Sequence, residues 1–141
     1  MEYVIGVVLA AAVCVFAMLA GFDRDRVFYP MLLVVVASYY ILFAAIGNST
    51  AALTIESLPA VVFLLLAVAG FKKSLWLIAA ALVGHGVFDM FHGLFIHNPG
   101  VPPWWPGFCM SFDVLAGGLL AVLLMRRSGF ASPIKHYRRQ E

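Results

Sequence analysis

The chain has 141 residues, of which 64% are hydrophobic and 11% are charged, and its formal net charge is +2. Soluble domains are about 45–50% apolar and about 25% charged, so this composition excludes an ordinary soluble domain and favours an integral membrane protein. A membrane span needs about 20 apolar residues, so the chain holds five spans with short connections and leaves no room for a soluble domain.

Apolar runs of near spanning length follow one another along the chain. We predict five transmembrane helices, at residues 3–21, 28–46, 51–71, 75–96 and 108–124. They form a single all-α bundle over residues 1–125, followed by a basic cytoplasmic tail over residues 126–141. A signal peptide would begin with basic residues, which the first run lacks, so we interpret that run as a retained membrane anchor.

Basic residues occur in alternate connections between the predicted spans. The nine of them form three groups: Arg24 and Arg26; Lys72 and Lys73; and Arg126, Arg127, Lys135, Arg138 and Arg139. Because basic connections stay in the cytoplasm, we predict an N-out, C-in topology. So short a basic tail beside a span is expected to contact anionic membrane lipid, and it does not favour nucleic acid as a partner.

Five ionisable residues lie within the predicted spans, where charged side chains are costly and by default indicate a functional site. Glu56 lies in the third span, His85, Asp89 and His92 lie in the fourth, and Asp113 lies in the fifth. These three spans contain no Lys or Arg that could neutralise the carboxylates. A proton, a histidine, water or a metal ion must therefore do so.

The spacing of these residues predicts that they meet at one depth. His85, Asp89 and His92 stand at i, i+4 and i+7, within an arc of about 60° on one helix face. At about 1.5 Å per residue, His92 and Asp89 lie about 6 and 10 Å below the outer end of their span, and Glu56 and Asp113 each lie about 8 Å below theirs. We therefore predict a shared site in the outer half of the membrane.

Histidine and carboxylate side chains at one depth suit a metal ion. We predict Asp89, His92, Asp113 and Glu56 as its ligands, because Asp89 and His92 lie one helical turn apart. His85 is assigned to orienting Asp89 or relaying a proton, and with Glu56 it is the candidate catalytic residue. Imidazole and carboxylate ligands suit Zn, Fe, Mn or Cu and do not choose among them.

The two cysteines are predicted to be buried thiols without a disulfide between them. Cys109 lies one turn before Asp113 and is a possible thiolate ligand, but we interpret it as a small buried thiol. Cys14 lies deep in the first span, at a different depth from Cys109, which argues against a disulfide.

At these residues the chain resembles an uncharacterised family of short bacterial multi-pass membrane proteins, a domain of unknown function. The resemblance covers about residues 26–124 and rests on five features: a Gly-His-x-x-x-Asp-x-x-His block from Gly84 to His92, Glu56, the Asn98-Pro99 loop, Cys109 and Asp113. The family often has a second histidine directly after the block, where this chain has Gly93. The resemblance implies the bacterial inner membrane and carries no activity. A weaker analogy links the chain to ceramidase-like membrane hydrolases, which hold an intramembrane zinc.

Four classes of function stay open at this point, of which the fourth, proton or ion conduction, is weakened because no ionisable residue lies in the inner half of these spans to continue a path. The first is a metal-dependent enzyme acting on a lipid-like or other apolar substrate. The second is a metal-free acid–base isomerase of an apolar substrate. The third is a non-catalytic small subunit or assembly factor of a membrane complex, in which the polar residues form hydrogen bonds between helices. Membrane lipid, other membrane subunits and further copies of the chain are the expected partners.

Overall fold

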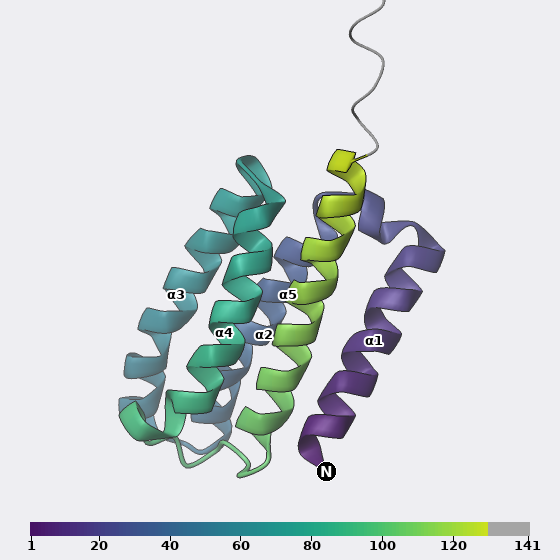
Figure 1. Cartoon of the computed structure of the whole chain (residues 1–141). Coiled ribbons are helices and arrows are strands. Elements are labelled where there is room, and N and C mark those ends of the chain that lie inside the picture. Colours follow the sequence, from purple (N-terminus) through teal and green to yellow (C-terminus); the bar gives the residue numbers. More distant parts are fainter. Residues whose placement is uncertain (130–141) are drawn as a thin grey trace, which may run out of the picture.

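Five long helices make up most of residues 1–129, the part of the chain that the computed structural model describes (Figure 1). In chain order they are α1 (Glu2–Ala20), α2 (Phe28–Ile46), α3 (Thr50–Lys72), α4 (Leu75–Phe95) and α5 (Trp105–Gly129), with a 3₁₀ turn, η1 (Phe22–Arg24), between α1 and α2. Each of the five is long and apolar enough to cross a membrane. The all-α class and the five predicted helices are confirmed.

The fifth helix differs most from its predicted bounds. It begins at Trp105 rather than at residue 108, because Pro106 is tolerated in the first helical turn, where its missing N–H has no intrahelical partner. It also runs past residue 124 through Arg126 and Arg127, which were predicted to lie in the tail. The remaining basic residues of the predicted tail lie outside the described residues: Lys135, Arg138 and Arg139.

Local sequence signals set several of the helix ends. The Ser49 hydroxyl accepts a hydrogen bond from the Ala52 N–H (3.1 Å) and starts α3, and the Ser74 hydroxyl accepts one from the Trp76 N–H (3.3 Å) and starts α4. Such caps satisfy N–H groups that the first helical turn leaves without partners. Gly21 ends α1 in the left-handed conformation, with φ of 79°, which glycine adopts without a steric penalty.

The helix α4 is central to the bundle, since it contacts α5, α3 and α2. Figure 1 shows α3, α4 and α5 side by side, with α2 behind them and α1 on the outer side of α5. Two glycines allow α4 and α5 to approach closely. A Cβ atom on Gly86 would lie 2.9 Å from the Met110 carbonyl oxygen, and one on Gly117 would lie 2.8 Å from that of Ala79. Small residues allow such close packing of membrane helices.

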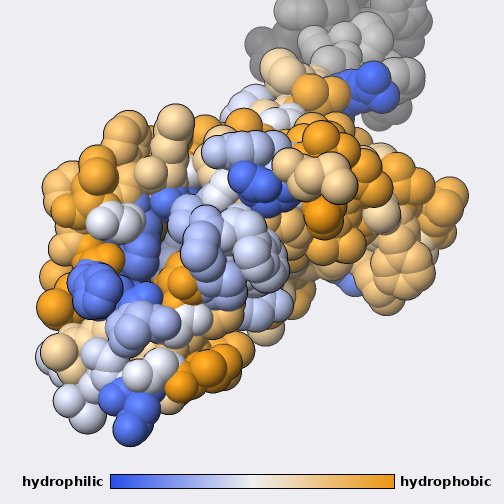
Figure 2. All heavy atoms as spheres, turned by 90° about the horizontal axis from the view of Figure 1, so that it is seen from below, coloured by the Kyte–Doolittle hydropathy of each residue, from blue (hydrophilic) through white to orange (hydrophobic). Residues whose placement is uncertain are grey.

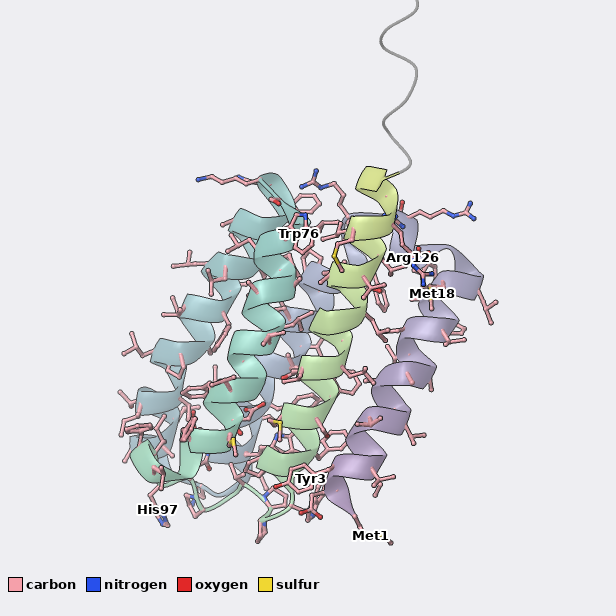
Figure 3. All side chains as sticks on the ribbon, viewed as in Figure 1. Met1, Tyr3, Met18, Trp76, His97 and Arg126 are labelled. Atoms are coloured by element: carbon pink, nitrogen blue, oxygen red, sulfur yellow. The ribbon has the colours of Figure 1, made fainter. Side chains whose placement is uncertain are left out.

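The two ends of the bundle differ in charge. The loop end, where residues 96–104 join α4 to α5, also carries Met1 and His97, whereas Trp76 and Arg126 lie at the other end (Figure 3). We call the end with Trp76 and Arg126 the basic end. It also carries η1 and the end of α3, and hence the basic residues that the structure describes, at positions 24, 26, 72, 73, 126 and 127. Figure 2 shows hydrophilic side chains gathered over the loop end and apolar side chains on the flanks.

An ion pair joins η1 to α5 at the basic end. The Arg127 guanidinium donates to a carboxylate oxygen of Asp23 at 2.8 Å and to the Asp23 backbone oxygen at 3.0 Å. The Arg127 side chain is 44% exposed, so water and salt weaken the attraction.

The interior of the bundle changes character along its axis. Toward the basic end it is apolar, with Ile78, Leu82 and Leu120 fully or almost fully buried. Toward the loop end the buried residues include six polar side chains: Glu56, His85, Asp89, His92, Asn98 and Asp113. All five ionisable residues that the sequence placed within the spans are therefore buried in the bundle, which is the arrangement expected of a site rather than of groups facing lipid.

Candidate metal centre

Four donor side chains meet between α4 and α5, and we call them the inner cluster: His85, Asp89, Cys109 and Asp113. One potential ligand atom from each lies within 4.8 Å of the other three. The His85 Nδ1 atom is 2.7 Å from the Asp113 Oδ2 atom and 3.3 Å from the Asp89 Oδ2 atom. The Cys109 sulfur is 3.6 Å from the Asp113 Oδ2 atom. All four residues are at most 2% exposed.

The sequence spacing explains why these four side chains converge. His85 and Asp89 are four residues apart on α4, and Cys109 and Asp113 are four residues apart on α5, so each pair lies on one face of its helix. The glycine at position 86 lets the two faces come close, because any larger residue there would meet the α5 backbone.

The inner cluster has too few donors for its acceptors. One nitrogen of His85 faces two carboxylates, and a single N–H can donate fully to only one of them. Both carboxylate oxygens of Asp89 and the Oδ1 atom of Asp113 have no hydrogen-bond partner. Buried carboxylates are costly unless they are paired, protonated or bound to a metal. A cation at this point would supply the missing positive charge.

The donor set fits a transition metal. One imidazole nitrogen, two carboxylate oxygens and one thiolate sulfur match the ligands of four-coordinate sites, and zinc accepts all three ligand types. The inner cluster is therefore a group of buried side chains that can hold a metal ion.

A second group of polar side chains, the outer cluster, lies nearer the loop end and consists of Glu56, His92 and Asn98. The His92 Nε2 atom is 2.7 Å from the Glu56 Oε1 atom. The Asn98 amide donates to that same oxygen at 3.0 Å and to the Tyr40 backbone oxygen at 3.0 Å, while its own oxygen accepts from the Gly100 N–H at 3.2 Å. Asn98 thus fastens the 96–104 loop to both α2 and α3.

Tyr40 of α2 lies between the two clusters. Its ring stacks on the His92 ring, with centroids 3.9 Å apart and planes 16° from parallel. Its hydroxyl lies close enough to Asp89 to interact electrostatically, although it has no well-aligned hydrogen bond. The two clusters therefore form one continuous polar region inside the bundle.

A narrow crevice between α2, α3 and α4 connects the same residues. Its polar lining is Tyr40, Glu56 and His85, its empty volume is about 170 Å³, and it does not admit a water-sized sphere. The Oε2 atom of Glu56 has no hydrogen-bond partner. The polar region is closed in this conformation.

The structure divides the predicted ligand set between the two clusters. Asp89 and Asp113 lie together in the inner cluster, whereas Glu56 and His92 pair with each other in the outer cluster. His85 was predicted to orient Asp89 or relay a proton. It lies among the potential ligands instead, and its Nδ1 atom is closer to Asp113 than to Asp89.

Two residues have a larger part in the site than the sequence indicated. Cys109, interpreted as a buried thiol, lies within the inner cluster. The sequence signal that could have identified Cys109 as a ligand is its four-residue spacing from Asp113, which repeats the spacing of His85 and Asp89. Asn98 appeared only as part of a loop, and helical periodicity could not place it, because a loop residue reaches its partners through tertiary contacts.

Both clusters are assembled from this chain's own helices and loop, so their chemistry follows from the donors and distances given above. The inner cluster is rich in negative charge and can hold a cation. The outer cluster is a hydrogen-bonded group of three side chains, in which the Oε2 atom of Glu56 has no partner. No protein-family model, curated protein or solved structure matches the chain.

Proposed function

We propose that this chain is a membrane protein that binds one divalent transition-metal ion through His85, Asp89, Cys109 and Asp113. The observation that carries the proposal is the convergence of four buried donors within 4.8 Å, among which three carboxylate oxygens have no hydrogen-bond partner. A divalent ion compensates the two carboxylates where bulk water does not reach. Of the predicted metals, the thiol favours Zn, Fe or Cu over Mn.

The closed geometry favours holding or delivering a metal over catalysis. Four protein ligands complete a tetrahedral shell, as in structural zinc sites, whereas catalytic sites keep a position open for water or substrate. The adjacent crevice does not admit a water-sized sphere. We therefore propose the role of a small metal-binding subunit or metal chaperone in the membrane.

A metal-dependent enzyme acting on a lipid-like substrate is the second candidate. One observation favours it: Glu56, whose Oε2 atom has no hydrogen-bond partner, and His85 line the same crevice. In that role the inner cluster would hold the ion, which would activate water as a nucleophile, and Glu56 would accept a proton if the crevice widened. A metal-free acid–base isomerase requires the same residues without an ion, so metal content separates it from both candidates.

The basic end faces the cytoplasm in this proposal. Its basic residues at positions 24, 26, 72, 73, 126 and 127 are those that the positive-inside rule retains. The loop end and both clusters then lie toward the outer surface, and the resemblance stated from the sequence favours a bacterial inner membrane. A fluorescent protein fused to the C-terminus should fold and fluoresce in the cytoplasm, and an alkaline phosphatase fused there should be inactive. The reverse pair of results would contradict this orientation.

Elemental analysis of the detergent-purified protein tests metal binding directly. We expect close to one equivalent of metal in the wild type, purified without chelators. The two buried cysteines provide a matched pair: Cys109→Ala should lose metal, and Cys14→Ala, in α1 and away from the cluster, should retain it. A wild type without metal, even after exposure to each candidate ion, would contradict the proposal.

Cobalt substitution distinguishes a closed site from an open one. Co(II) in the inner cluster should give a thiolate-to-cobalt charge-transfer band that persists in Cys14→Ala and disappears in Cys109→Ala. Added azide should leave the visible spectrum unchanged if the four side chains fill the coordination shell. A spectral change on adding azide would show an open position and favour the enzyme.

A further inference from the structure

We infer that Glu56 and His92 form a second, transient cation site, through which a divalent metal ion passes from the loop end to the inner cluster. This inference rests on the proposed function, because it concerns how the ion reaches the site proposed there. It assigns to the outer cluster a role in the rate of metal loading, and not in the final coordination of the ion.

The outer cluster has the donors for a transient site. The Nε2 atom of His92 and the Oε1 atom of Glu56 are already 2.7 Å apart, and imidazole and carboxylate are both ligands for divalent transition metals. The Oε2 atom of Glu56 adds a further donor, since it has no hydrogen-bond partner in a residue that is only 1% exposed. An arriving ion would be held by the same two atoms, and the proton between them would leave with the water that the ion loses on binding.

The outer cluster also lies on the path that an ion would take. His92, Asp89 and His85 follow one another on one face of α4, and His92 is nearest the loop end. The step from His92 to Asp89 is about 4.5 Å along the helix axis, so an ion can exchange ligands from one residue to the next. The Tyr40 ring stacks on His92, and its hydroxyl interacts electrostatically with Asp89, so Tyr40 borders the path.

An approach from the basic end is less favourable. In the described part of the chain, the interior toward that end is packed with apolar side chains, among them Ile78, Leu82 and Leu120. A divalent ion would lose its hydration there and find no ligand, which is a large free-energy penalty. Toward the loop end, the carboxylate of Glu56 attracts a cation, and an acidic site in low-dielectric surroundings raises the rate of cation arrival.

The test is the rate of metal uptake by the metal-free protein in detergent. Co(II) is mixed rapidly with the protein, and the thiolate-to-cobalt band reports when the ion reaches Cys109. Glu56→Gln and His92→Gln should each slow uptake about tenfold, because the attraction or the ligand on the path is lost. Glu2→Gln removes a carboxylate at the same end but outside the cluster and should leave the rate unchanged.

Release should slow together with uptake. A residue that acts only on the path changes both rates by the same factor, so the dissociation constant, the final band intensity and the spectrum of each variant should equal those of the wild type. We would measure release with an excess of chelator and check the helical content of each variant by circular dichroism.

Three results would overturn the inference while leaving the proposed function intact. The first is uptake by Glu56→Gln and His92→Gln at the wild-type rate. The second is a lower final band intensity or an altered spectrum, which would place these side chains in the resident site or in a purely structural network. The third is a change in the release rate alone. A wild type that binds no metal would instead contradict the proposed function itself.

Discussion

The inner and outer clusters lie one helical turn apart on α4, yet their charges are balanced differently. In the outer cluster one carboxylate, on Glu56, receives contacts from both His92 and Asn98 at a single oxygen. In the inner cluster one nitrogen of His85 faces two carboxylates, and the Cys109 thiol contacts one of them, on Asp113. The outer cluster is thus nearly self-sufficient, whereas the inner cluster lacks positive charge.

This difference shows that the number of buried polar residues does not by itself identify a metal site. Both clusters contain histidine and carboxylate, and both are buried. What separates them is the number of acceptors left without a donor: three carboxylate oxygens in the inner cluster and one in the outer cluster. Unpaired buried acceptors are costly, so the inner cluster has the greater need for a cation.

The largest expected effect on metal content comes from removing a carboxylate from the inner cluster, compared with removing one from the outer cluster. Asp89→Asn should abolish metal binding, because it removes a ligand and half of the negative carboxylate charge that holds the ion. Glu56→Gln should keep the wild-type metal content at equilibrium. Elemental analysis of the two variants side by side checks this, and equal loss of metal in both would place the ion between the clusters.

The next effect concerns the contact that holds α4 and α5 together. Gly86→Ala should destabilise the protein by about 1–3 kcal/mol, since the added methyl group lies 2.9 Å from the Met110 backbone oxygen. It should also make the bound metal easier to extract, because the two halves of the inner cluster are on these helices. Thermal unfolding in detergent and chelator resistance are the measurements.

Gly84→Ala is the matched control for that variant. A Cβ atom at position 84 meets nothing within 4 Å, so the change should be neutral or stabilise the helix by about 0.5–1 kcal/mol. A similar loss of stability in both variants would show that the α4–α5 contact at Gly86 does not decide the result, since helix propensity alone would stabilise both.

A smaller effect is expected at the outer cluster. Asn98→Ala should remove the hydrogen bonds from the loop to Tyr40 and Glu56, at about 1 kcal/mol for each, and so free the 96–104 loop. Chelator-driven loss of metal should then be several-fold faster, with the metal content at saturation unchanged. Protection of the loop from protease in the wild type and cleavage in the variant would support the same conclusion.

The smallest effect is expected far from both clusters. Asp23→Asn weakens the ion pair with Arg127, and a pair with so exposed a partner contributes about 0–1 kcal/mol. The variant should bind metal as the wild type does, and its slight loss of thermal stability should vanish at high salt. A loss of metal in this variant would show that metal binding depends on the stability of the whole bundle and not only on the ligands themselves.

The sequence predicted most of the fold because apolar runs of near spanning length favour helices strongly. Each apolar run of near spanning length became a helix, and the first four match their predicted bounds within one residue at each end. The exception is α5, whose start at Trp105 depends on how a proline fits the first helical turn and whose end is not marked by hydropathy. Hydropathy detects burial in lipid, and it does not detect where a helix continues beyond the apolar core.

By itself, the sequence determined which residues are exceptional: the five ionisable side chains within the spans, all of which are buried in the bundle. Helical spacing also determined that His85, Asp89 and His92 share a face. Only the tertiary structure decided their partners, joining His85 and Asp89 to Cys109 and Asp113, and His92 to Glu56 and Asn98. The reason is physical: periodicity fixes the direction of a side chain on its own helix, whereas its neighbours depend on how helices rotate and approach, here through the close contact at Gly86.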